Sequence, residues 1–283
     1  MLPDAFRAEL YRLSKNRVTL FWAVAFVPLA FLIGGLAAGF FIVGKTKAMA
    51  ADLSVGGEMA TTNLADPLMA MVGQVSNVAT LAFLMIAAAT LFAGDYRWET
   101  WRLVIARNSR VNLVLGKLLT LGVMIMVASL AFLLAGMIIL VAVGLYEASG
   151  LSFAPTVQQW GQFGGLYLTG IARLLQVMVL GLLAAVVTRS LMAALFVPIV
   201  ISIAQDFAEK MLGFLEIAPT DWQAVFLSPG LAAEHLKQAI SVGLPPALGE
   251  SLVPLSVGSL ALWIAVPVGL SLLLFQRQGL SKE

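Results

Sequence analysis

The densest group of charged and aromatic side chains lies between residues 95 and 117, inside an otherwise apolar sequence. Long apolar runs flank this segment, so in a membrane protein it must lie outside the bilayer. This density of charges and aromatics is typical of a docking surface. The alternative is an interfacial loop whose tryptophans are anchored among lipid headgroups. The residues expected to contact a partner are Asp95, Tyr96, Arg97, Trp98, Glu99, Thr100 and Arg102.

The local sequence predicts how this segment is built. Residues 95–102 contain neither glycine nor proline and can form a short helix, with Asp95 and Glu99 near its positive N-terminal end. Asn108 and Ser109 are typical of a turn, and a new helix is expected to continue through Lys117.

A second candidate site consists of ionisable residues inside two predicted membrane spans. Arg173 lies well inside one span, and Asp206 lies in the outer half of the next. A buried arginine is costly in lipid unless it is paired. We therefore expect an Arg173–Asp206 pair, with Glu209 as the alternative partner. Such a pair is either a structural clamp between two spans or a polar spot that lines a pathway.

Residues for catalysis or metal binding are scarce. The chain has one histidine, His235, and no cysteine. A metal site needs several converging ligands, and the H-E-x-x-H pattern of zinc peptidases is absent. We expect no catalytic residue and no metal ion, and an exposed or packing role for His235.

Residues 39–46, with the sequence GFFIVGKT, fit the pattern of a phosphate-binding loop. Such a loop requires a preceding strand and a following helix, with backbone amides that cradle phosphate. These residues instead end a predicted membrane span, so the match is expected to be accidental. We expect this chain to bind no nucleotide and no other cofactor.

Composition defines the class of protein. Of the 283 residues, 60% are hydrophobic and 11% are charged, against about 25% charged in soluble domains. A single soluble core of this size could not hide so many apolar residues. The chain is therefore expected to be an integral membrane protein with one domain, residues 1–283. Its spans are expected to be helices, giving an all-α fold, because the period-2 alternation typical of barrel strands is absent.

Six apolar stretches are long enough to cross a bilayer, at about 20 residues each. They are residues 18–43, 73–93, 115–146, 163–188, 191–214 and 251–275. The third is longer than a bilayer requires and is expected to begin as a cytoplasmic extension or to tilt. The fourth and fifth are separated only by a tight turn at residues 188–190.

The placement of lysine and arginine predicts the orientation. In a six-span arrangement only Lys45, Lys47, Lys210 and Lys237 fall on one side. The other side is much more basic, and the positive-inside rule therefore places both termini in the cytoplasm. The basic residues on that side are Arg7, Arg12, Lys15, Arg17, Arg97, Arg102, Arg107, Arg110, Lys117, Arg189, Arg277 and Lys282.

Two segments outside the spans are also expected to be ordered. Leu2, Phe6, Leu10 and Leu13 recur at helical spacing and predict an N-terminal interfacial helix. The first apolar run is too long for a signal peptide and is expected to be a permanent span. Residues 216–250 should form a small ordered segment on the outer face, with a short helix over residues 231–242.

Small residues at a spacing of four predict close helix packing. Gly35 and Gly39 form one such pair, and Gly161 and Gly165 form another. Packing within one subunit and packing between two copies both remain open.

The segment after the second span resembles the ABC-2 family of ABC-transporter permeases. In that family the second span is followed by an acidic residue and by a short helix that ends in a Thr-x-Arg-Leu element. An arginine turn and then a Gly-Lys pair come next. Here these positions are Asp95, residues 99–103, residues 108–110, and Gly116 with Lys117. Glu99 and Asn108 stand where the family usually has glycine and proline. The six-span topology and the N-terminal helix extend the resemblance over the whole chain.

This resemblance implies the permease subunit of an ATP-driven exporter in a plasma membrane of the bacterial inner-membrane type. It implies a second permease copy, giving a homodimer or a pair of related permeases, and two separate ATPase subunits that bind ATP and magnesium. Residues 95–102 would be the coupling helix seated on the ATPase. No catalytic activity of the chain itself, and no nucleic-acid partner, is implied.

Two other classes of function remain as alternatives. An ion-coupled secondary transporter would show inverted repeats and broken helices with charged midplane residues. An intramembrane enzyme would show catalytic side chains converging within the spans. The substrate is not readable from the sequence.

Overall fold

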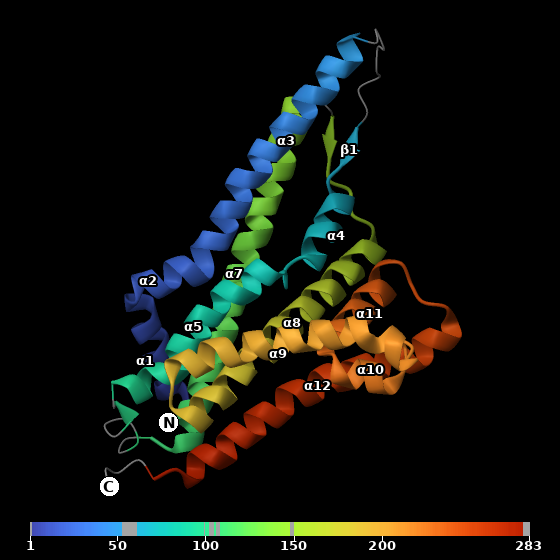
Figure 1. The fold of residues 1–283 in the computed structure, drawn as a ribbon. Helices are drawn as coiled ribbons and strands as arrows, with labels where there is room; N and C mark the ends of the chain where they lie inside the picture. The colour runs from blue at the N-terminus through green and yellow to red at the C-terminus, as the bar shows by residue number, and fades with distance from the viewer. Residues whose placement is uncertain are drawn as a thin grey trace.

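The computed structural model describes residues 2–52, 61–98, 100–101, 105, 108–147 and 150–279. The described residues are almost entirely helical. Within them, 6 helices are long and apolar enough to cross a membrane. The expectation of an all-α, multi-pass membrane protein is confirmed at that level (Figure 1).

The chain begins with a short helix, continues through a first long helix that contains a π-helical stretch, and then alternates long and short helices. Two short strands pair with each other beside the long helices. In chain order the elements are α1 (Leu2–Lys15), α2 (Arg17–Leu20), η1 (Phe21–Phe26), α3 (Val27–Asp52), β1 (Thr62–Asn63), α4 (Ala65–Gly73), α5 (Val78–Arg97), α7 (Arg110–Glu147), β2 (Leu151–Ser152), α8 (Val157–Thr188), α9 (Leu191–Met211), η2 (Leu212–Leu215), α10 (Trp222–Leu227), α11 (Pro229–Ser241) and α12 (Pro246–Arg277).

Local capping signals set several helix ends. Thr156 and Gln159 form a capping box at the start of α8. Arg189 ends α8 in the left-handed conformation, with φ of 55°, and the Ser190 side chain then caps α9. The expected tight turn at residues 188–190 is therefore confirmed. The expected short helix after Ser228 is also present, as α11.

The second span differs from its prediction at both ends. The predicted start, Gly73, instead ends α4, and the Asn77 side chain caps α5 by accepting a bond from the Thr80 amide. At the other end α5 continues through Arg97. Asp95 and Tyr96 therefore belong to the last turns of the span, and a separate helix does not begin at Asp95. A continuous helix costs less here because it satisfies the backbone at the membrane boundary.

Helices α3 and α7 form a long pair that rises above the rest of the molecule (Figure 1). A Cβ atom at Gly35 would lie 2.5 Å from Ile139 Cδ1, and one at Gly39 would lie 2.4 Å from Val143 Cγ2. Both glycines therefore let α3 approach α7 within one chain. The same helix runs unbroken through residues 39–46, so the phosphate-loop pattern does not form a loop. The 38 residues of α7 are about 57 Å long, so α7 extends beyond the hydrocarbon core or tilts.

Helix α8 lies at the centre of the remaining helices. It contacts α4, α5, α9, α11 and α12, and 72% of its most apolar window is buried. The corresponding fraction is 17% for the fifth span and 11% for the first. Their exposed apolar side chains are what lipid contact requires.

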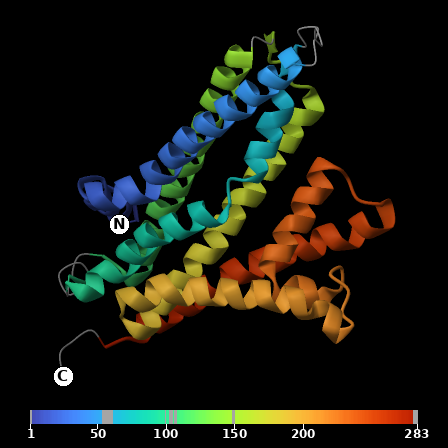
Figure 2. The ribbon, with the colours of Figure 1, turned by 45° about the horizontal axis from the view of Figure 1, so that its top comes forward.

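One end of the molecule gathers α1, the last turn of α5, the first turns of α7 and the C-terminal end of α12 (Figure 2). Arg189, in the turn between α8 and α9, donates a hydrogen bond to the Gly279 carbonyl at this end. The opposite end carries the parallel pairing of β1 with β2, and the ordered segment before the last span consists of α10 and α11.

Candidate functional site

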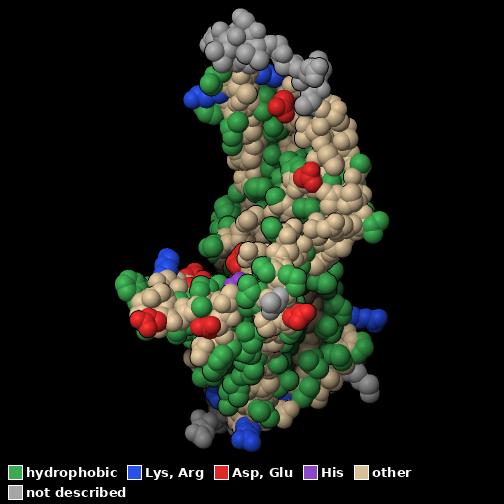
Figure 3. Space-filling model, turned by 90° about the vertical axis from the view of Figure 1, so that its right-hand side faces the viewer, with side chains coloured by type: hydrophobic (Ala, Val, Ile, Leu, Met, Phe, Trp, Pro, Cys, Tyr) green, Lys and Arg blue, Asp and Glu red, His purple; other side chains and the backbone are tan. Residues whose placement is uncertain are grey.

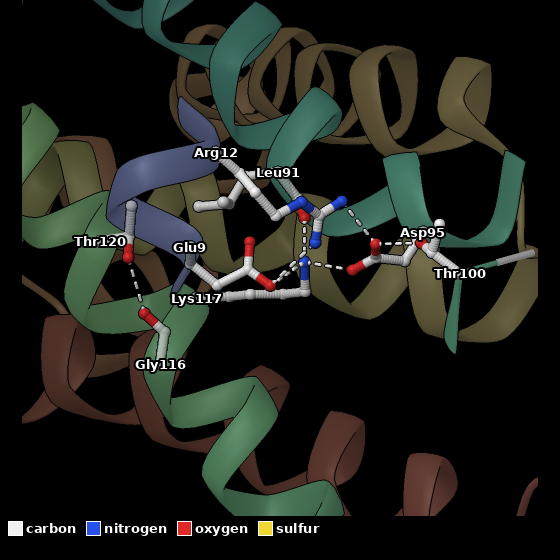
Figure 4. Close-up of polar contacts among 8 residues, drawn as sticks. All are labelled: Glu9, Arg12, Leu91, Asp95, Thr100, Gly116, Lys117 and Thr120. Carbon is white, nitrogen blue, oxygen red and sulfur yellow. Dashed lines mark hydrogen bonds and ion pairs between the residues drawn. The ribbon is translucent and has the colours of Figure 1, made fainter. Parts of the chain in front are cut away.

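A buried charge cluster lies where α1, α5 and α7 meet (Figure 4). Its members are Glu9, Arg12, Asp95 and Lys117. Lys117 Nζ lies 2.6 Å from Asp95 Oδ2 and 3.1 Å from Glu9 Oε1. Arg12 Nη2 lies 2.7 Å from Asp95 Oδ1, and Arg12 Nη1 lies 3.2 Å from Glu9 Oε1. Two carboxylates and two cations thus form one neutral cluster that joins three helices.

Lys117 and Asp95 are the most deeply buried charges of the cluster, each 1% exposed. Lys117 Nζ also donates to the Leu91 carbonyl at 2.7 Å and lies 5.1 Å from the centre of the Trp101 ring. The Thr100 hydroxyl donates to Asp95. Charges this deeply buried are stable only when each is paired and hydrogen-bonded. Lys117 has both kinds of partner, two carboxylates and a backbone carbonyl.

Arg12 is the member of the cluster that reaches water, with 45% of its side chain exposed. Burial alone would lower the pKa of Arg12. The hydrogen bond and charge of Asp95, together with the charge of Glu9, outweigh burial and raise that pKa. Arg12 is therefore positively charged throughout the physiological range.

Gly116 explains how α1 comes close enough to α7 for these contacts. A Cβ atom at Gly116 would lie 3.0 Å from Ala5 Cβ and 3.1 Å from the Ala5 carbonyl carbon and the Phe6 nitrogen. The backbones therefore nearly touch at this point. The buried face of α1 is Ala5, Glu9 and Leu13, one helical position away from much of the predicted stripe. Gly116 lets α1 approach α7 on this face.

The C-terminal end of α12 is attached to the same region. Arg110 Nη1 donates to the carbonyls of Phe275, Gln276 and Gln278 at 2.8 to 2.9 Å. The Trp101 ring lies 4.5 Å from the Phe275 ring. A basic side chain on the last carbonyls of a helix also matches the negative end of its dipole. The last span is thus held to the start of α7.

The structure separates the predicted docking residues into two groups. Asp95, Tyr96 and Thr100 contact this chain: Asp95 and Thr100 join the cluster, and the Tyr96 hydroxyl bonds to the Gln278 side chain at 3.0 Å. Arg97 and Trp98 are exposed, with Arg97 5.3 Å from the Trp98 ring centre. Glu99 and Arg102 lie outside the described residues.

A cavity of about 360 Å³ lies between α5, α8, α9 and α11. Arg173, Asp206, Glu209, Glu234 and Lys237 lie in its wall together with apolar side chains. Both members of the predicted Arg173–Asp206 pair are therefore brought to one cavity. They belong to the described part of the chain, and no ion pair joins them there.

Arg173 instead donates to the Gln176 side-chain oxygen one helical turn along α8. Glu209 accepts a hydrogen bond from the Ser228 hydroxyl. Gly230 makes room for both, because a Cβ there would lie 3.1 Å from Arg173 Nη2 and 3.3 Å from Glu209 Oε1. The Arg173 guanidinium is thus engaged by Gln176, and the predicted direct contact with Asp206 does not form.

His235 lies on α11 and is 8% exposed, so it has the packing role rather than the exposed one. Burial lowers the pKa of His235, in spite of the charges of Glu209 and Glu234 nearby. Among the described residues no group of three or more His, Asp or Glu side chains could hold a metal ion.

Sequence reasoning missed Glu9 and the role of Arg12. Two features of the sequence point toward the cluster. Glu9 and Arg12 lie three residues apart on one predicted helix. Lys117 begins a long apolar run and therefore needs a buried counter-charge. Neither signal identifies which distant helix supplies the partner.

Comparison of the chain with family models, curated proteins and solved structures gave no match. The coarse class is therefore defined by the fold alone: a multi-pass, all-α protein with 6 candidate membrane spans. The buried charge cluster and the cavity are the features of this fold that bear on function.

Proposed function

We propose that this chain is the membrane-spanning permease subunit of an ATP-driven exporter of the ABC-2 type. In this proposal a separate ATPase binds ATP and magnesium, and the permease moves substrate across the membrane. The observation that carries it is the buried cluster of Glu9, Arg12, Asp95 and Lys117. This cluster joins α1, α5 and α7, and the Thr100 hydroxyl attaches the segment after α5 to it.

A rigid connection at this place suits force transmission. Helix α5 ends at the exposed Arg97, and the segment between α5 and α7 begins with the exposed Trp98. An ATPase seated on this segment would push directly on the end of α5. Because Asp95 is ion-paired to both α1 and α7, those helices would follow the movement of α5. Packed elements joined in this way move together rather than bend independently.

The proposal includes the orientation and the assembly. The end of the molecule with Arg12, Arg17, Arg110, Arg189 and Arg277 faces the cytoplasm of a bacterial-type cell, as the positive-inside rule favours. Both termini lie on that side. Two ATPase subunits and a second permease copy complete the transporter, most simply as a homodimer. The permease chain performs no catalysis of its own.

An ion-coupled secondary transporter is the second candidate function. The observation that favours it is the cavity with Arg173 and three carboxylates within the candidate spans and α11. Such a protein would transport without an ATPase, whereas the permease would not.

Purification of the tagged chain from membranes of its own host, after mild crosslinking, tests the proposal. Vanadate-sensitive ATP hydrolysis should accompany the wild-type chain. Charge reversal at the expected contact residues, Glu99→Lys with Arg102→Glu, should remove most of that activity because the docking charges would repel.

The matched control reverses two exposed charges at the other end of the molecule, Lys45→Glu with Glu147→Lys. It should retain the ATP hydrolysis. If hydrolysis is absent from the wild-type preparation, or if it persists unchanged after reversal at Glu99 and Arg102, the proposed coupling surface is wrong.

A further inference from the structure

The cavity between α5, α8, α9 and α11 has a polar side and an apolar side. Its volume of about 360 Å³ lies within the range of about 300–1,000 Å³ usual for small-molecule sites. Val78, Leu81, Met85, Val177 and Ile203 form the apolar side. Such a surface fits the hydrophobic body of an amphipathic molecule.

The mouth of the cavity opens on the outer surface of the bundle. Val78 is 81% exposed and Ile203 is 62% exposed, and both line the cavity. Viewed from the side of α10 and α11, acidic side chains gather across the middle of the molecule above a largely hydrophobic lower part (Figure 3). A ligand could therefore enter sideways from the apolar phase with its polar group toward the acidic region.

The charges in the cavity wall do not cancel. Lys237 forms an ion pair with Glu234 at 2.8 Å, which removes both from the balance. Arg173 remains, and it faces two carboxylates, Asp206 and Glu209. One negative charge is thus left over. Asp206 is exposed, and none of the hydrogen bonds or ion pairs of the described chain satisfies its carboxylate.

Two hydroxyl groups in the same wall also lack a partner. Ser76 Oγ, just before α5, and Ser202 Oγ, on α9, are buried without a hydrogen bond within the described part of the chain. Buried polar atoms are normally satisfied, and hydroxyl oxygens can accept from an N–H donor. They lie in the wall that a bound ligand would contact.

From these features we infer that the cavity binds an amphipathic organic cation, with its positive group near Asp206 and its apolar body against α5 and α9. The excess carboxylate supplies the counter-charge for the cation, and the apolar side chains of the same cavity contact its body. The idea that this ligand is the transported substrate rests on the proposed export function. Binding of the ligand in the cavity does not depend on that function.

The test uses two probes of nearly the same shape and opposite charge, tetraphenylphosphonium and tetraphenylborate. Binding to the purified full chain in nanodiscs of zwitterionic lipid is measured by equilibrium dialysis, with empty nanodiscs subtracted. Saturable binding is expected for the cation and not for the anion. Asp206→Asn should weaken binding of the cation about tenfold, because it removes the unpaired charge.

Two variants serve as controls for charge and location. Glu147→Gln removes an exposed acid at the end of α7, far along the chain from the cavity wall, and should leave cation binding unchanged. Lys237→Gln frees Glu234 and should tighten cation binding. Because Asp206 is exposed, its variant should fold, and an unchanged melting temperature verifies this.

Equal or stronger saturable binding of the anion, no saturable binding of either probe, or unchanged cation binding in Asp206→Asn would each overturn the inference. The assay contains no ATPase, so its failure is separate from failure of the proposed function. Cation binding without any associated ATP hydrolysis would keep the site and reject the exporter.

Discussion

Lys117 is the residue on which the proposed coupling region most depends. It is buried and touches two carboxylates and a backbone carbonyl. Such a lysine cannot be replaced by an apolar residue of similar length without leaving Glu9 and Asp95 undercompensated. The effect should be much larger than that of a lysine at the surface.

Lys117→Met should lower the free energy of unfolding by about 3–5 kcal/mol, the usual loss when one partner of a buried ion pair is removed. Thermal unfolding in detergent measures it. The matched control is Lys237→Met, whose partner Glu234 is 69% exposed, and it should cost no more than about 1 kcal/mol. Equal losses at the two positions would contradict the structural role of the cluster.

Adding Asp95→Asn to Lys117→Met should restore part of the loss, because the uncompensated charge is then removed.

The contact between α1 and α7 decides whether the cluster can form. Gly116 allows this contact because its missing side chain leaves room for the backbone of α1. On the same helix, Gly122 has no atom within 4 Å of the position of a Cβ atom. The two glycines therefore separate the effect of close approach from the effect of glycine on helix propensity.

Gly116→Ala should destabilise the protein by about 1–3 kcal/mol, as overpacking does, and should loosen α1. Gly122→Ala should be neutral or stabilise by up to about 1 kcal/mol, because alanine favours a helix. Unfolding midpoints and protease sensitivity near Lys15 report the two effects. An equal response of both variants would mean that α1 is not seated on α7 as described.

The close packing of α3 on α7 limits which surface is available for a dimer. Gly35 and Gly39 predicted a close contact from their spacing, and the contact lies within the chain. A second copy must therefore use another surface in the proposed dimer. Exposed apolar side chains on α9 and on the first span are available for lipid or for such a contact.

For the whole molecule, the proposed orientation follows from the basic end that gathers α1, the start of α7 and the end of α12. The chain contains no cysteine, so a single introduced cysteine reports the side of the membrane without background. Four exposed positions suit this purpose: Ser14, Gln276, Glu147 and Glu250.

A membrane-impermeant maleimide applied to intact cells should label Glu147→Cys and Glu250→Cys. It should label Ser14→Cys and Gln276→Cys only after permeabilisation, because the basic end is retained in the cytoplasm. Much stronger labelling of the first pair than of the second pair in intact cells would support this orientation. The reverse pattern would invert the orientation and with it the proposed coupling face.

The class of fold and much of its local structure can be predicted from residues that are close together in the chain. Apolar runs longer than a bilayer predicted the six spans, because a backbone in lipid must form helices. Local signals predicted the turn at Arg189 and the start of α11 after Ser228. These features depend on residues within a few positions of one another, and that information is present in any short stretch of chain.

Which charges meet depends instead on how distant helices pack together. Arg12 and Asp95 are 83 positions apart, and no local signal indicates which face of α1 lies on α7. The same limit explains why the structure brings Arg173 and Asp206 to one cavity without an ion pair. Helix rotation and separation depend on the packing of every neighbouring side chain, with glycines such as Gly116 and Gly230 setting the closest approach. The spacing of residues along one helix contains none of that information.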